Sequence, residues 1–362
     1  MIQIRPSGST MWTKCAANPL FSAHSPKQPD SDAAREGTCA AWVAECVLKG
    51  DATIAEDLLG KTHENGWFVT PDMVNYVQGY IDLIQSRGGV TTAECFVRLN
   101  EFIAGTFDSA VDATAQNGTL HIDDLKYGHK IVEVFENTQV IIYGEAEARR
   151  LEANGVVILN VQLGIYQPRA WHPDGYYRTW TMSRAELRMW GQWIENQGAL
   201  CQVPEPVATP GSQCEYCTGA LRCAAAAATL QHAFEIIRSS RHREPSTEEL
   251  VAELDFLDKM EAVMKGRKTA ISTEASARMD KGEHIRGWYK KPRKGNRQFK
   301  YSRDVMLALT GIDPEKKTMM TPAEFEREGA DVKAVKALTY QPDIPSVLSR
   351  FPEAVIRKAF GT

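Results

Sequence analysis

GTFDSAVDATAQNGTLHIDDLKYGHKIVEVFENTQVIIY, residues 105–143, contains two strand-like segments separated by Asn117-Gly118. Asn-Gly is the strongest short signal for a β-hairpin, so the two segments are predicted to pair as neighbouring strands. Side chains alternate along a strand, and this places Asp124 and Lys126 on one face. Asp108, on the adjoining strand, can join them there.

An acidic residue on one strand and an acid-x-Lys pair on the next are typical of metal-dependent phosphodiesterases. The carboxylates bind a hard divalent cation through oxygen. The metal polarises the phosphate and lowers the pKa of a bound water, and the lysine places positive charge where negative charge develops. Taken alone, this pattern is also common on solvated strand faces. Gln139 and Tyr143 strengthen it, since they stand four residues apart on one face of a helix predicted over 136–152.

Asp108 and Asp124-Leu125-Lys126 resemble the motif of the PD-(D/E)XK nuclease superfamily, and Gln139 and Tyr143 match the Q-x-x-x-Y motif of its RecB-like branch. The resemblance implies an α/β fold, a mixed central sheet flanked by helices. It also implies the following roles: Asp108, Asp124 and the Leu125 carbonyl hold one or two Mg²⁺ or Mn²⁺ ions, Lys126 assists the attacking water, and Gln139 and Tyr143 orient the motif or contact the scissile strand.

A helix predicted over 33–48 carries a further candidate metal ligand. Its start at Glu36-Gly37-Thr38 resembles the first RecB-like motif, in which E-G-T is followed by a His and then by a Glu four residues later. Glu45 occupies the Glu position and is the implied ligand. Ala41 occupies the His position, which removes a nitrogen ligand and puts the preferred divalent ion in question. The alternative interpretation of Glu45 is an acid on a helix surface.

Cys214, Cys217 and Cys223 form a C-x2-C-x5-C pattern that supplies three thiolates within one loop. Four soft ligands complete a zinc or iron–sulfur site. The arrangement resembles the iron–sulfur nucleases, namely the AddB-type nuclease domain and the CRISPR-adaptation exonucleases, which carry one more cysteine ahead of the nuclease motifs. Cys15 is the matching residue. The resemblance implies a structural [4Fe-4S] cluster, an iron–sulfur clasp that joins the two ends of the nuclease domain, with zinc as the alternative. The other cysteines lack such spacing and are expected to be buried apolar residues: Cys39, Cys46, Cys95 and Cys201.

The charge of the chain is unevenly distributed. The 362 residues have a net charge of -4. Residues 1–230 contain 17 basic and 26 acidic residues, whereas residues 231–362 contain 25 and 20. We therefore predict an iron–sulfur PD-(D/E)XK nuclease domain over 1–230 and a basic, mainly helical region with a DNA-binding role over 231–362. No run of residues approaches a membrane span, and residues 1–6 lack a signal-peptide core, so a cytoplasmic location is expected, or the host cytoplasm for a phage-encoded protein.

Residues 231–362 contain two recognisable patterns. Ser246 and Glu249 form a capping box that opens a long helix with apolar residues at Leu250, Leu254, Leu257 and Met260. Bases and aromatics then alternate over 287–301, as in contacts with single-stranded nucleic acid; a solvated hairpin is the alternative. The candidate DNA-binding residues there are Trp288, Lys290, Lys291, Arg293, Lys294 and Arg297.

Arg169 is a further candidate DNA contact. It follows a strand predicted over 155–166, in a Q-P-R sequence that resembles an uncharacterised phage and prophage family of RecB-like nucleases. Its position allows either a phosphate contact or an ion pair with an acid.

The predicted function is a Mg²⁺- or Mn²⁺-dependent DNA exonuclease. The resemblance favours 5′-to-3′ degradation in phage recombination or replication, with DNA and a phage single-strand annealing or single-strand-binding protein as partners. Two alternatives remain open. One is a catalytically silent DNA-binding or scaffold protein with a nuclease fold, which Ala41 favours. The other is a restriction-type endonuclease.

Overall fold

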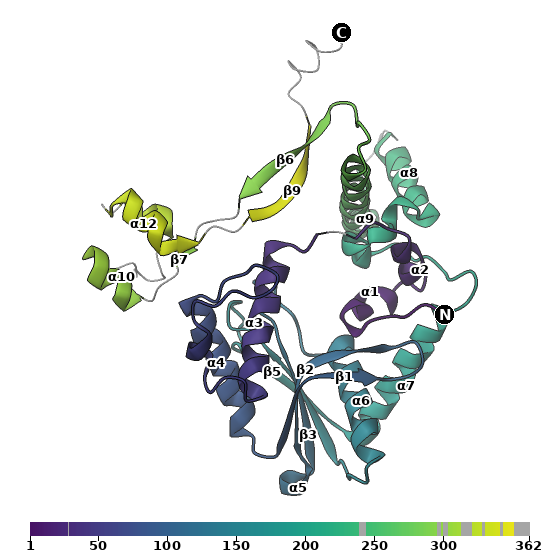
Figure 1. Cartoon of the computed structure of the whole chain (residues 1–362). Coiled ribbons are helices and arrows are strands. Elements are labelled where there is room, and N and C mark those ends of the chain that lie inside the picture. The colour runs from purple at the N-terminus through teal and green to yellow at the C-terminus, as the bar shows by residue number, and fades with distance from the viewer. Residues whose placement is uncertain are drawn as a thin grey trace.

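The computed structural model describes residues 1–27, 29–238, 244–294, 298–299, 303–312, 321–327, 330–340 and 343–350. At the centre of this part of the chain lies a five-stranded sheet (Figure 1). In their order across the sheet, its strands are β1 (Val90–Arg98), β2 (Ala104–Ala113), β3 (Thr119–Leu125), β4 (Asn160–Tyr166) and β5 (Tyr177–Ser183). β3 and β4 are parallel, and the other neighbouring pairs are antiparallel. The predicted mixed sheet is therefore present.

The predicted pairing of β2 with β3 is confirmed, with Ser109 opposite Asp123. The connection is longer than a two-residue turn, because it contains the one-turn helix α5 (Thr114–Asn117). Asp112 Oδ1 accepts hydrogen bonds from the backbone and hydroxyl of Thr114 at the start of this turn. Gly118 closes the turn with φ +73°, a conformation that favours glycine.

Helices cover both faces of the sheet (Figure 1). α6 (Thr138–Glu152) and α7 (Arg184–Leu200) pack over one core, which contains Ile122 and Leu163. α3 (Asp32–Leu48) and α4 (Pro71–Ser86) pack over a second core on the other face, which contains Val111. Ile122 and Asp124 share a strand face, so Asp124 points toward the side of α6.

Each of these four helices begins at a polar cap. The side chains of Ser31, Thr70, Asn137 and Ser183 accept hydrogen bonds from the first turns of α3, α4, α6 and α7. Such caps satisfy backbone N–H groups that lack a partner inside the helix. The predicted helix over 136–152 is observed as α6, two residues shorter at its start because Asn137 is the cap.

Short elements join the beginning of the chain to the segment after α7. The first group is η1 (Pro6–Gly8), α1 (Ser9–Trp12) and α2 (Asn18–Ala23), and η2 (Ala55–Leu58) follows α3. The later group is η3 (Ser212–Tyr216) and η4 (Thr218–Leu221). The backbone N–H of Ala17 donates to Val207 O, and the Ser25 hydroxyl donates to Thr218 O, so the two groups are held together across about 190 residues of sequence.

The described part of the C-terminal region is mainly helical, as predicted. Its helices are α8 (Ala224–Arg238), α9 (Thr247–Asp280), α10 (Arg303–Thr310), α11 (Pro322–Arg327) and α12 (Val332–Leu338). The capping box of Ser246 and Glu249 opens α9 as expected. The region also contains strands: β6 (Trp288–Lys294) pairs with β9 (Asp343–Arg350), and β7 (Gln298–Phe299) pairs with β8 (Thr339–Tyr340). The basic segment is thus not a local hairpin, since its partner strand lies about 50 residues later. Among the described helices, none combines the length and apolar character needed to cross a membrane.

Candidate active site

Asp124 and Lys126 lie on one face of the end of β3 and form an ion pair, with Lys126 Nζ 2.7 Å from Asp124 Oδ2. Gln139, in the first turn of α6, connects both residues. Lys126 donates to Gln139 Oε1 at 3.1 Å, and Gln139 Nε2 donates to Asp124 Oδ1 at 3.2 Å. The Tyr143 hydroxyl lies 3.4 Å from Gln139 Nε2, one helical turn further on. The acid-x-Lys pair and the Q-x-x-x-Y pair therefore form one hydrogen-bond network.

Asp108 extends from β2 to the same group. Its Oδ2 accepts a hydrogen bond of 2.7 Å from the backbone N–H of Leu125, which fixes this carboxyl beside Asp124. Desolvation and the neighbouring Asp124 raise the pKa of Asp108 well above its usual value, although Lys126 and the Leu125 N–H counteract this. Burial lowers the pKa of Lys126, but Asp124 and Asp108 outweigh burial and leave it raised. The lysine therefore carries its charge at neutral pH.

Glu94 is a member of this group that the sequence did not identify. It lies on β1 between Ala93 and Cys95, which pair with Ser109 and Phe107, so it is opposite Asp108. Its φ is +45°, an uncommon value for a residue with a side chain. Burial raises the pKa of Glu94 to about 7, and Glu45 and Asp124 add to this effect. The only sequence signal was an acid in the predicted strand, because its kinked backbone depends on the pairing of β1 with β2.

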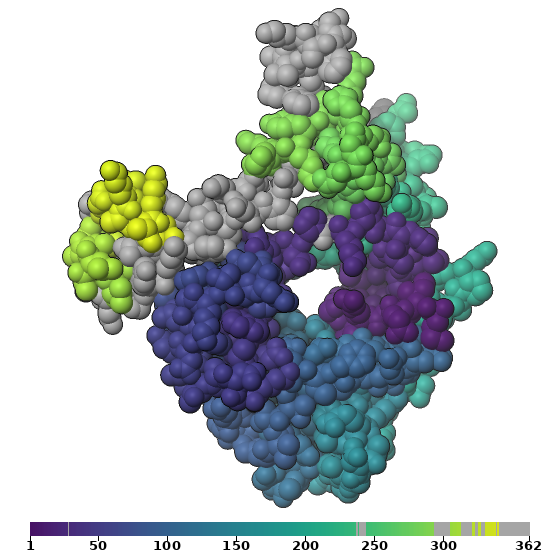
Figure 2. All heavy atoms as spheres, viewed as in Figure 1, coloured from purple at the N-terminus to yellow at the C-terminus, as the bar shows by residue number. Residues whose placement is uncertain are grey.

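Glu45 reaches the edge of the same group from the last turn of α3. Its carboxylate accepts from Lys49 Nζ at 2.6 Å, and its charge contributes to the raised pKa of Glu94. Ala41, one helical turn earlier, adds no ligand atom. Figure 2 shows an opening above β1 and β2, between the dark blue and purple mass that includes α3 and the purple N-terminal helices. The elements that carry Glu45, Glu94 and Asp108 thus border a space open to solvent.

The carboxyl groups fit a small divalent cation in their chemistry. Mg²⁺ usually keeps several waters and takes only one or two protein carboxylates together with substrate phosphate. Asp124 Oδ2 is buried with Lys126 as its ion-pair partner, and Asp108 stands beside Asp124. In the described part of the chain, no three histidine, cysteine, aspartate or glutamate side chains are arranged so as to hold a metal by themselves. Asp108 and Asp124 are therefore suited to an ion that is completed by water and substrate.

Asp123, next to Asp124 in sequence, belongs to a different arrangement on the α4 side of the sheet. Its fully buried Oδ1 accepts from Arg87 Nη2 at 2.8 Å and from the Tyr177 hydroxyl at 2.9 Å. Burial raises the pKa of Asp123 to about 6, against the effects of Arg87 and Tyr177. This ion pair ties α4 to β3 and β5, so Asp123 is structural.

His121 neighbours this ion pair and provides a pH-dependent prediction. Its ring faces Arg87 and Gln162, and burial together with the Arg87 charge lowers its pKa from 6.5 to about 4. The folded protein thus keeps His121 neutral at pH values where the unfolded chain binds a proton. Its contribution to stability is complete above pH 6.5 and is lost as the pH falls toward 4. His121→Gln is expected to remove about 2 kcal/mol of this acid sensitivity, measured by urea unfolding between pH 4 and 7. Equal pH slopes for the two proteins would contradict this.

The four predicted cluster cysteines line one small cavity between α2, η3 and the start of α8: Cys15, Cys214, Cys217 and Cys223. Each sulfur lies within hydrogen-bond distance of a nitrogen: Thr209 N at Cys15, Gly211 N at Cys214, Asn18 Nδ2 at Cys217 and Ala226 N at Cys223. Donors of this kind stabilise ligating thiolates. The four thiol groups are suitable ligands for an iron–sulfur cluster or for zinc. In the structure, however, their sulfur atoms are not arranged so as to hold a metal ion. Cys39 and Cys201 are buried, as expected, whereas Cys46 and Cys95 are partly exposed.

The predicted DNA-binding residues lie in two places. Arg169 pairs with Glu36 at 2.7 Å and stacks over Tyr127, so it joins the end of β4 to the start of α3. Lys290, on β6, pairs with Asp280, and Lys291 is exposed. Trp288, at the start of β6, is 38% exposed. Arg293 and Lys294 belong to β6 but their side chains lie outside the described residues, as does Arg297 entirely.

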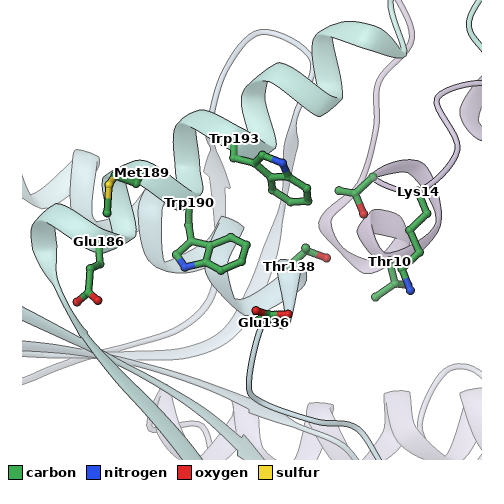
Figure 3. A pocket seen from close by; sticks show the side chains of 9 residues that line it. Thr10, Lys14, Glu136, Thr138, Glu186, Met189, Trp190 and Trp193 are labelled. Atoms are coloured by element: carbon green, nitrogen blue, oxygen red, sulfur yellow. The ribbon is translucent and has the colours of Figure 1, made fainter.

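A cavity of about 750 Å³ lies between α1 and α7 (Figure 3). Trp190 and Trp193 line it from α7, and Lys14 lines it from the other side. The two indole rings are nearly perpendicular, with centroids 5.8 Å apart. Thr138 also lines the cavity and directly precedes Gln139 in the sequence.

Comparison with known proteins gives a family but no activity. A family model described as "Protein of unknown function (DUF2800)" matches residues 3–343. No curated protein matches the chain.

Two solved structures are similar at a low level. The structure of SSO0001 has a TM-score of 0.30 and 12% identity, over 62% of this chain and 86% of that one. An alkaline exonuclease (LHK-Exo) from Laribacter hongkongensis has a TM-score of 0.24 and 11% identity, over 55% of this chain and 90% of that one. Similarity at this level does not indicate the function of the chain.

Proposed function

This chain belongs to the DUF2800 family, and from its site we propose that it is a metal-dependent nuclease that hydrolyses phosphodiester bonds of DNA. The observation that carries the proposal is the joint placement of Asp108, Asp124 and Lys126 beside Gln139. Two carboxylates and a charged lysine side by side are the groups that phosphodiester hydrolysis needs.

The residues of the site have separable roles in this proposal. Asp108 and Asp124, with the Leu125 carbonyl, would hold Mg²⁺ or Mn²⁺, and Glu45 and Glu94 would add negative charge around it. A bound ion would supply positive charge to the phosphate and activate a water. Lys126 stabilises the charge that develops on phosphate oxygens as water adds to phosphorus and the sugar oxygen leaves. Gln139 holds Lys126 and Asp124 in register, and Tyr143 anchors Gln139.

The surroundings suit a nucleic-acid strand. Trp190, Trp193 and Lys14 offer aromatic faces and a cation in the cavity that Thr138 also lines, a combination on which bases stack while the backbone is neutralised. The basic strand β6 would contribute further contacts through Trp288, Lys290 and Lys291. The predicted roles of Arg293, Lys294 and Arg297 are part of the same proposal.

The activity assay separates the three candidate functions. Purified protein is incubated with Mg²⁺ or Mn²⁺ and with linear DNA, labelled at the 5′ or the 3′ end, beside closed circular DNA. Degradation that requires ends supports an exonuclease, and early release of the 5′ label supports the predicted 5′-to-3′ polarity. Cleavage of the closed circle would instead support an endonuclease. Binding without degradation would support the scaffold alternative.

Glu94 allows a test of the carboxylate group beyond the sequence motif. Above pH 7, where Glu94 is ionised, Glu94→Gln removes a charge near Asp108 and Asp124, so it is expected to raise the Mg²⁺ concentration for half-maximal activity by about tenfold. Glu101→Gln, in the exposed turn between β1 and β2, is the matched control. An unchanged Mg²⁺ requirement in Glu94→Gln would remove Glu94 from the site.

We also propose that Cys15, Cys214, Cys217 and Cys223 hold a structural [4Fe-4S] cluster. Protein purified without oxygen is then expected to be brown and to contain iron and sulfide, whereas colourless protein with zinc would support the zinc alternative. Cys217→Ala is expected to lose the colour and to lower Tm by about 5 °C or more, because the cluster links segments distant in sequence. Cys46→Ala is the control. Full colour and stability in Cys217→Ala would contradict the assignment.

A further inference from the structure

The long helix α9 presents an apolar surface to solvent. Leu250, Leu254, Leu257, Met264 and Ile271 are between 37% and 62% exposed. The opposite side of the helix packs against the cysteine segment, through the buried residues Val263, Gly266 and Ala270. The sequence predicted an apolar stripe on this helix, and the structure leaves most of that stripe outside the core.

The exposed residues follow the spacing of a coiled coil. From Leu250 to Ala275, the positions on this face alternate between four and three residues apart: 250, 254, 257, 261, 264, 268, 271 and 275. This is the a/d pattern of heptads, in which each side chain inserts between residues of a facing helix. We call this face the α9 seam. It extends over about 38 Å, long enough for a helix partner.

The two halves of the seam differ in shape. In the C-terminal half, Met264, Ile271 and Ala275 line a cavity of about 430 Å³, whose other walls include Leu230 of α8 and Trp288 of β6. The N-terminal half, with its three leucines, lines no such cavity among the described pockets. If a second copy of α9 ran in the opposite direction, its leucines would lie against the cavity of the first copy. At the other end, the leucines of the first copy would lie against the cavity of the second.

The charged residues of the seam select the same direction. Glu261 and Lys268 occupy two of its positions, and both are exposed. In a parallel pair, each would face the identical residue of the second copy, which places like charges together. In an antiparallel pair centred between residues 262 and 263, Glu261 of each chain lies one layer from Lys268 of the other and one layer from the second Glu261. The two attractive Glu–Lys pairs then outnumber the single repulsive Glu–Glu pair. Polar residues at such positions fix the orientation of coiled coils.

We propose that the α9 seam is the interface of a homodimer in which two copies of α9 pack antiparallel about a two-fold axis. The interface is self-complementary, as a two-fold interface must be. It lies on the helix face opposite the Cys214 segment, so the cluster cysteines remain covered by α9 in each chain. The inference does not depend on the nuclease proposal.

Sedimentation of the full-length protein over a range of concentrations tests this interface. The unaltered chain is expected to sediment as a dimer. Leu254→Lys puts a charge into the seam twice per dimer, and it is expected to raise the dimer dissociation constant by about 100-fold or more. Asp255→Lys, on the adjacent exposed position, is the matched control and is expected to remain dimeric. Circular dichroism checks that both variants keep their helices.

Charge exchange tests the orientation. Glu261→Lys and Lys268→Glu are each expected to weaken the dimer, and the double variant is expected to restore it. Mixing the two single variants is expected to yield a heterodimer, since each then offers the charge that the other lacks. A monomeric unaltered chain, or a dimer that Leu254→Lys leaves intact, would overturn the proposal. If both single variants dimerised as tightly as the unaltered chain, the antiparallel arrangement would be overturned. The same would follow if the double variant failed to restore a weakened dimer.

Discussion

Asp124→Asn is expected to reduce the rate of DNA degradation by at least about 1,000-fold, because it removes one of two carboxylates proposed to hold the divalent ion and the direct partner of Lys126. The fold is expected to persist. Asparagine keeps an oxygen near Gln139, and the loss of one negative charge relieves the repulsion that raises the pKa of Asp108. The rate is measured on end-labelled linear DNA with saturating Mg²⁺ or Mn²⁺.

A matched control for this variant lies on the neighbouring strand. Asp112→Asn alters an acid of the same hairpin whose Oδ1 only caps the turn at Thr114, and asparagine can accept the same hydrogen bonds. Its activity is expected to remain near that of the unaltered protein. If Asp124→Asn retained activity within about tenfold while folded, the carboxylate site would not be the catalytic one, since loss of a main electrostatic contributor costs about 100-fold or more.

Gly266→Ala is expected to destabilise the protein by about 3 kcal/mol, although alanine is normally the better helix residue. A Cβ at this position would lie 1.8 Å from the carbonyl oxygen of Cys214, which is a backbone atom and cannot rotate away. α9 would have to move off the cysteine segment, so the four cysteines are also expected to react faster with thiol reagents. Urea unfolding and the rate of thiol modification measure the two effects.

Gly37→Ala provides the comparison for Gly266→Ala. Gly37 also lies inside a helix, α3, but its Cβ would meet no atom within 4 Å. It is expected to gain up to about 1 kcal/mol, the usual advantage of alanine over glycine in a helix. Equal effects at the two positions would show that helix propensity, and not contact with Cys214, controls Gly266.

Predictions from strand alternation and helix capping agree with the structure, because both depend on residues that are close in the sequence. Strand alternation separated Asp124 from Asp123, because adjacent side chains leave a sheet on opposite faces. The structure accordingly pairs Asp123 with Arg87 under α4 and Asp124 with Lys126 near α6. The predicted helix start at Ser246 follows from a side chain that satisfies a backbone N–H group of the first turn.

The sequence alone determined the hairpin that carries Asp108 and Asp124 and the helix that carries Gln139, since each follows from short-range periodicity and turn or cap signals. The mixed α/β architecture was implied by the resemblance of its motifs. Only the tertiary structure brought Glu94 to the site, because its side-chain direction depends on a backbone kink in β1 and on the register against β2. Only the tertiary structure left the α9 stripe exposed. Periodicity specifies that a helix has an apolar face, but which surface covers that face depends on how the whole chain packs.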